Sequence, residues 1–116
     1  MNTENKNTIL DALRLASGVI DQIAYVNVAG VIGTPTNITW SAASGGYLNL
    51  SASVDFTNTS GSDINIIGIA LLSSDTTPTA GQLATTEAVA ISYFGSTIQV
   101  QDNEILRVSN ATYTID

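Results

Sequence analysis

Residues 48–57, LNLSASVDFT, alternate apolar and polar side chains without a break. The apolar residues are Leu48, Leu50, Ala52, Val54 and Phe56, and the polar residues between them are Asn49, Ser51, Ser53, Asp55 and Thr57. Successive side chains of a β-strand point to opposite faces, so this pattern predicts one strand with a buried face and a solvent-facing one. We expect most other segments to pack against its apolar face.

Two further segments have strand patterns with apolar residues on both faces. Residues 22–28, QIAYVNV, alternate with period two, and residues 64–72, INIIGIALL, are apolar almost throughout. Strands buried on both sides have this composition. Gly68 indicates a place where another backbone or a large ring comes close. A short strand is expected over 37–41, where Trp40 anchors the core and its indole N–H needs one acceptor.

The C-terminal third of the chain predicts three more strands, over residues 86–94, 97–101 and 105–115. Gly95 is expected to turn the chain after the first of them, and Asp102–Glu104 to turn it before the last. Apolar residues of the last strand change parity near Asn110, and a β-bulge there would keep them on one face. Residues 73–85 form the longest irregular stretch and are the best candidate for a contact-making loop.

Turn residues separate these strands. SGG at 44–46 leads into the central segment, and NTSGSD at 58–63 is expected to join two strong strands as a hairpin. Seven or eight strands with turns spaced in this way predict a mainly β fold, a single antiparallel β-sandwich, rather than alternating strands and helices.

The N-terminus predicts one short helix. Residues 1–7 are polar and are expected to form a loose arm, and the sandwich domain to span 8–116. Thr8 suits an N-cap with Asp11 three residues later, and apolar residues at helical spacing favour a helix over 9–17. So short a helix must dock on something. It could close one end of the sandwich or dock onto a neighbouring subunit, and the sequence leaves both open.

Charge and reactive residues exclude several classes of function. The 116 residues are enough for one domain with its own core. Cysteine and histidine are absent, which removes disulfides, thiolate zinc sites and the usual general base. Ten acidic residues against three basic ones give a net charge of −7. Nucleic acids and anionic membranes bind clustered basic residues, so we expect neither as a partner.

Few residues remain that could carry chemistry. A catalytic serine or threonine needs a base, and Lys6 lies in the polar arm. The carboxylates fall on solvent-facing strand positions or in turns, where nothing raises their pKa. Asp55, Asn58, Ser62 and Asp63 surround one turn and could offer oxygens to Ca²⁺, but such residues usually bond to their own backbone. We therefore predict a non-enzymatic protein without a catalytic, cofactor-binding or metal site.

Six segments follow one another in an order that resembles small β-sandwich structural proteins of tailed bacteriophages. They are TILDALRLASG (8–18), IDQIAYVNVAG (20–30), LNLSASVDFTNTSG (48–61), INIIGIALLSS (64–74), QLATTEAVAISYF (82–94) and a closing hairpin, IQVQDNEILRVSNATYTI (98–115). The resemblance implies a building block of the virion, on the capsid surface or in the tail, and often a trimer.

The leading hypothesis is thus a capsid decoration or cement protein, made in the host cytoplasm and located in the virion. Its partners would be the major capsid protein or other virion proteins, and sister copies in a homotrimer. The contacts would come from strand edges, the N-terminal helix and the 73–85 loop. The alternatives are a tail, baseplate or fibre subunit, and a carbohydrate-binding β-sandwich module. The last would need exposed aromatic side chains on one face.

Overall fold

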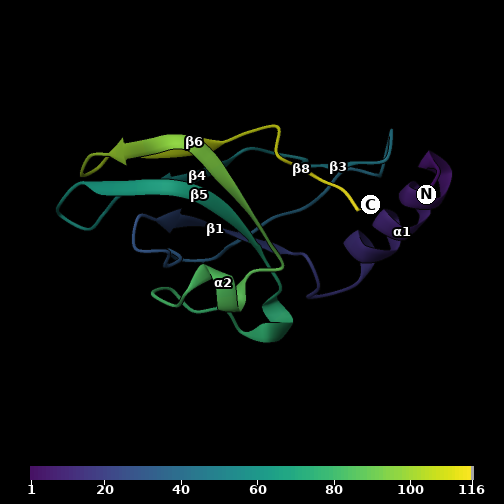
Figure 1. The fold of residues 1–116 in the computed structure, drawn as a ribbon, viewed down its shortest axis with the longest axis horizontal. Coiled ribbons are helices and arrows are strands. Elements are labelled where there is room, and N and C mark those ends of the chain that lie inside the picture. The colour runs from purple at the N-terminus through teal and green to yellow at the C-terminus, as the bar shows by residue number, and fades with distance from the viewer. Residues whose placement is uncertain (116) are drawn as a thin grey trace.

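Strands in two facing layers form the body of the protein, and a helix lies at one end (Figure 1). The computed structural model describes residues 1–115. Its helical elements are α1 (Thr3–Leu15), the 3-10 helix η1 (Ser74–Thr76) and α2 (Ala84–Glu87). Its strands are β1 (Gln22–Asn27), β2 (Thr36–Asn37), β3 (Leu48–Asn49), β4 (Val54–Thr57), β5 (Ile64–Leu72), β6 (Ala90–Val100), β7 (Ile105–Val108) and β8 (Thr112–Tyr113). The predicted mainly β, antiparallel sandwich is confirmed; Asp116 lies outside the described residues.

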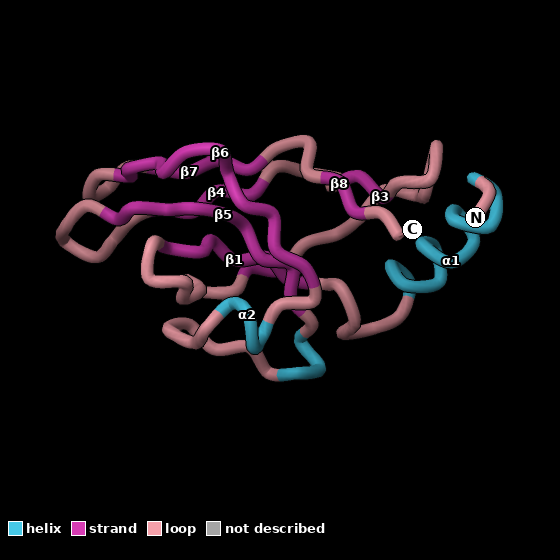
Figure 2. The backbone as a smooth tube through the Cα atoms, viewed as in Figure 1, coloured by secondary structure: helices cyan, strands magenta, loops and turns pink. Residues whose placement is uncertain are grey.

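The larger layer is a four-stranded sheet in the order β2-β1-β5-β6. The smaller layer pairs β3 with β8 and β4 with β7 (Figure 2). Apolar side chains from both layers and from α1 fill the space between them, and the buried ones are Leu10, Ile20, Ile23, Ile38, Leu48, Val54, Phe56 and Leu71. On the other face of the larger sheet, a second cluster includes Ala70 and Leu72, covered by Ile32 and by Ala84 of α2. The segment 64–72 is therefore a central strand buried on both faces, as predicted.

The alternating segment 48–57 is interrupted, contrary to the prediction of one continuous strand. Its residues that face the core are Leu48, Leu50, Val54 and Phe56. Ala52 is exposed instead. The N–H of Leu50 still donates to Ala111 O, but the N–H of Ser51 donates to Thr39 O, so the chain leaves the C-terminal strand for three residues.

The predicted parity change near Asn110 is present, but as a break between β7 and β8 rather than as a β-bulge, because the extra residue lies opposite, in the segment 48–54. Leu48 pairs with Tyr113 but Val54 pairs with Val108, so the register shifts by one residue between the two pairs. Asn110 lies in the shift, with a φ of 59°. Because of it, Val108 and Tyr113 both pack on the same core.

The segment expected as a strand over 37–41 passes from one layer to the other. Its first residue belongs to β2, which pairs with β1, whereas Trp40 forms a bridge with Leu50 in the smaller layer. The indole N–H of Trp40 donates to Ile20 O at 2.8 Å, which supplies the predicted acceptor. Residues 37–41 therefore connect the two layers along this side of the sandwich.

Two predicted hairpins are wrong. β4 and β7 pair with each other in the smaller layer, whereas β5 and β6 belong to the larger sheet. Residues 58–63, which lead from β4 to β5, therefore cross between the layers. The turn at 102–104, which leads from β6 to β7, crosses back. Asn58 holds the two crossings together: it is 4% exposed, and its Nδ2 donates to Ser62 O at 2.7 Å and to Val100 O at 2.8 Å.

The N-terminal arm is also not loose. α1 begins at Thr3 and ends at Leu15, because Asn2 rather than Thr8 is the N-cap and accepts from the N–H of Asn5 at 2.8 Å. Leu10 is fully buried against the core. Of the two arrangements that the sequence left open, the helix takes the one in which it closes the end of its own sandwich.

β6 differs from its prediction at both ends. It begins at Ala90, since Ala84–Glu87 form α2, and it continues through Gly95 to Val100. Tyr93 pairs with Gly68 and Ile98 with Ile66, so four residues of β6 face one residue of β5. The expected turn is thus a wide bulge, where β6 bends in Figure 1.

Gly68 has the close backbone approach that the sequence predicts. A Cβ at this position would lie 2.5 Å from Ser92 O and 3.2 Å from Tyr93 Cα. We expect Gly68→Ala to lower the free energy of unfolding by about 1–3 kcal/mol through overpacking. Gly95→Ala is the matched control, because nothing lies within 4 Å of its Cβ position. Urea unfolding followed by circular dichroism measures both, and equal stability of the two variants would contradict the expectation.

Candidate functional site

Hydrogen bonds from neighbouring residues lower the pKa of three carboxylates. Asp11 accepts from the N–H of Ala43 at 2.8 Å and from Arg14 Nε at 2.7 Å, which together lower its pKa. Burial alone would raise the pKa of Asp21, but hydrogen bonds from the hydroxyl and N–H of Ser74 outweigh it and lower that pKa. These carboxylates tie α1 and η1 to the sandwich.

Asp55 and Arg107 form the third such contact, a two-bond ion pair across β4 and β7. Arg107 Nε and Nη2 donate to the two carboxylate oxygens at 2.7 and 3.0 Å. The pair lowers the pKa of Asp55 and raises that of Arg107.

A pH dependence of stability follows from Asp11 and Asp55. Their carboxyl pKa values are lower in the folded chain than the ordinary value of 3.8, so folding is favoured by the ionised forms. Their contribution is complete above pH 3.8 and is lost as the pH falls through the folded pKa values. We expect the urea concentration at the midpoint of unfolding to decrease as the pH is lowered below 3.8. For Asp55→Asn we expect this concentration to decrease less steeply with pH than for the wild type. An unchanged slope in the variant would contradict this role of Asp55.

The oxygens considered for Ca²⁺ do not form a site. Asp55 is held by Arg107, and Asn58 is buried with its amide bonded to backbone and to Ser60. Asp63 accepts instead from Gln99 Nε2 at 3.1 Å. Within residues 1–115, no three acidic side chains gather where they could hold a metal ion.

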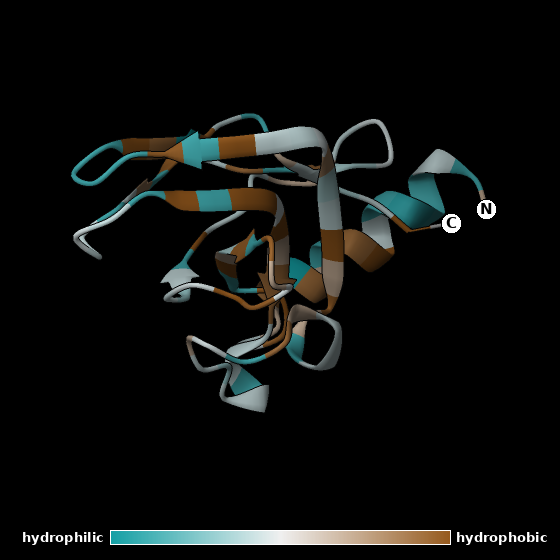
Figure 3. Ribbon diagram, turned by 60° about the vertical axis from the view of Figure 1, so that its left-hand side comes forward, coloured by the Kyte–Doolittle hydropathy of each residue, from teal (hydrophilic) through white to brown (hydrophobic). Residues whose placement is uncertain are grey.

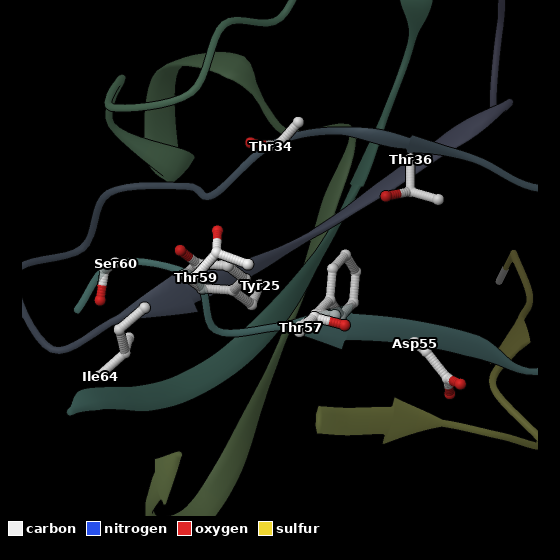
Figure 4. Close-up of a pocket in the computed structure, with 9 residues that line it drawn as sticks. Tyr25, Thr34, Thr36, Asp55, Thr57, Thr59, Ser60 and Ile64 are labelled. Carbon is white, nitrogen blue, oxygen red and sulfur yellow. The ribbon is translucent and has the colours of Figure 1, made fainter. Parts of the chain in front are cut away.

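A polar cleft of about 250 Å³ lies beside β4 (Figure 4). Its lining residues are Tyr25, Thr34, Thr36, Asp55, Phe56, Thr57, Thr59, Ser60 and Ile64. Its two aromatic rings, Tyr25 and Phe56, pack edge to face with centroids 5.8 Å apart, and Tyr25 also lies directly against Gly33. Asp55 lies at one end, turned away from the other labelled side chains. The cleft therefore presents mainly hydroxyl groups, and its two rings are packed against each other.

An apolar groove of about 390 Å³ opens on the other side of the sandwich, between β6 and the β7–β8 segment. Its lining residues are Ile23, Trp40, Ile69, Leu71, Ala90, Ile91, Ser92, Phe94, Val108, Asn110, Ala111, Thr112 and Tyr113. None of them is charged. The groove exists because β6 and β7 belong to different layers and, in the described chain, no segment bridges the layers here.

β6 itself is the edge of the larger sheet beside this groove. It pairs with β5 on one side, and no strand of residues 1–115 pairs with it on the other. Residues 88–101 contain no charged side chain, and Figure 3 shows β6 brown to pale over most of its length. Tyr93 is 58% exposed and Val89 46%. We define the β6 edge as residues 89–94, which run from the residue before β6 through its regular part, 90–93, to the first residue of the bulge. This edge, together with the groove, is the candidate site.

The sequence did not single out this surface. Its pattern assigned 86–94 to a strand but could not tell which strand would be at an edge, because that depends on pairing between distant segments. The absence of charge over 88–101 was the one available signal.

Comparisons of the chain with known protein families, curated proteins and solved structures found no match. Among the described residues, neither helix is long and apolar enough to cross a membrane.

Proposed function

We propose that the chain is a non-enzymatic structural protein of a tailed-bacteriophage virion, which decorates or cements the capsid surface by protein–protein contacts. The observation that carries this proposal is the β6 edge with its groove. An apolar, uncharged strand edge of a soluble domain is an aggregation risk unless another chain covers it. A virion component has such a cover in its assembled state.

Two further observations support an assembly role. Asp11, Asp21 and Asp55 stabilise the fold through hydrogen bonds or ion pairs and gather into no reactive centre. α1 is docked on its own sandwich, so assembly would use preformed surfaces. The partners of the protein are then the major capsid protein and sister copies in a homotrimer, as the resemblance to phage sandwich proteins implies.

The copy number in purified virions tests this proposal. Quantitative mass spectrometry, with the major capsid protein as internal standard, is expected to give hundreds of copies per particle. Particles lacking the protein are expected to release their genome at lower temperature. Only a handful of copies per particle would indicate a tail, baseplate or fibre role in place of the capsid role. Absence from every virion would overturn the proposal.

A further inference from the structure

We propose that the β6 edge and the adjacent groove are the surface on which a second copy of this chain docks. The inference deepens the proposed function, because it names the surface of self-assembly, but its test needs no virion. The contact would extend the four-stranded sheet of one copy by a strand of another.

The β6 edge can accept a strand because its backbone is unpaired on one side. Residues 90–93 are in regular register with β5, so their outward N–H and C=O groups form a short straight row. The other edge of the same sheet, β2, has only two paired residues. In the smaller layer, β4 and β7 carry the Asp55–Arg107 ion pair. The pair β3–β8 is uncharged but has only two paired residues in each strand, so the β6 edge is the longest uncharged edge of the described chain.

Apolar side chains border this row. Val89 and Tyr93 are exposed, and Ile91 and Phe94 line the groove. A docked chain would remove this surface from water at roughly 25 cal/mol per Å². The groove would receive side chains from the incoming copy, as pockets do when a strand is added to a sheet edge.

The distribution of charge favours another copy as the occupant. Each chain carries a net charge of −7, so two copies can meet only where carboxylates are absent. Glu87 and Asp102 flank the 88–101 stretch, which itself has none, and the groove lining also has none. A basic partner would gain nothing from this surface and would be drawn to the acidic remainder of the chain.

Molar mass by light scattering tests the inference directly. At micromolar concentration the purified chain is expected to have two or three times the 12.0 kDa of one copy. Tyr93→Asp places like charges at the contact and is expected to weaken association by about a hundredfold or more, returning the mass to one copy. Tyr47→Asp is the matched control, because Tyr47 is 48% exposed but lies in the turn after Gly46. It is expected to leave the oligomer intact.

A chain that is monomeric at these concentrations would overturn the inference, as would an oligomer that survives both Tyr93→Asp and Ser92→Lys. If these variants fail to fold, hydrogen exchange of the wild type decides instead. Amides of residues 90–93 are expected to exchange more slowly as protein concentration rises, whereas those of residues 73–85 should not change. Unchanged exchange at residues 90–93 would contradict the contact.

The outcomes separate this inference from the proposed function. A monomer present in hundreds of copies per virion would overturn the contact and leave the capsid role intact. If the chain forms an oligomer but is absent from every virion, the contact stands and the capsid role is overturned. Twice the mass of one chain would keep the β6 contact and replace the proposed trimer by a dimer.

Discussion

Replacing Leu10 by alanine is expected to lower the free energy of unfolding by about 2–5 kcal/mol, the usual range for a fully buried leucine. Leu10 is 0% exposed and is the one buried side chain of α1. It enters the core from the end of the sandwich, where it joins residues of both layers. The cavity left by alanine would lie where the helix meets the sheets, and the helix would then be held by the half-buried Leu13 and by the hydrogen bonds from Ala43 to Asp11 and from Gly46 to Asn7.

Leu15→Ala is the control for this experiment. Leu15 ends the same helix but is 70% exposed, so its truncation should change stability by no more than about 0.5 kcal/mol. Urea unfolding at one fixed protein concentration compares the variants, because self-association would itself shift stability. If Leu10→Ala were as stable as Leu15→Ala, α1 would not be an integral part of the fold.

The helix also shows what the sequence could and could not predict. The apolar spacing of Ile9, Ala12, Leu13 and Ala16 predicts a docked helix that starts at Ile9, because residues 1–7 are polar. The helix is present, but the side chain that it buries is Leu10, and Ile9 is 40% exposed. The polarity of residues 1–7 reflects the exposed face of the first turns rather than a lack of structure. Asn7 accepts from the N–H of Gly46 at 2.9 Å, a long-range contact that local patterns cannot reveal.

Strand positions were predictable from local apolar spacing, as the helix was, whereas strand partners were not. Burial alternates locally, so segments 22–28 and 64–72 were placed well. A turn such as 58–63 has the same composition whether it reverses the chain within one sheet or crosses between two. The difference lies in which distant strand is paired, and it decides that β6 becomes an edge beside an open groove. The candidate surface was therefore beyond local sequence patterns.

Asn58 shows how the crossing is stabilised, and Asn58→Ala is expected to lower the free energy of unfolding by about 2–4 kcal/mol. The substitution removes the donors to Ser62 O and Val100 O in a buried place, where water cannot replace both. It also removes the acceptor of the N–H and hydroxyl of Ser60. Loop 58–63 and the end of β6 would lose the side chain to which both are hydrogen-bonded.

The matched control is Asn65→Ala, because Asn65 is an exposed asparagine in neighbouring β5 and should change stability by no more than about 0.5 kcal/mol. Asn58→Asp adds a sharper test: a carboxylate would face two carbonyl oxygens, which raises its pKa in the folded chain. Stability of this variant, relative to wild type at each pH, should therefore rise as the pH falls, since the protonated acid regains one donor. A variant as stable as wild type at neutral pH would show that the two crossings are joined by their backbone contacts alone, such as that from the N–H of Asn103 to Asn58 O.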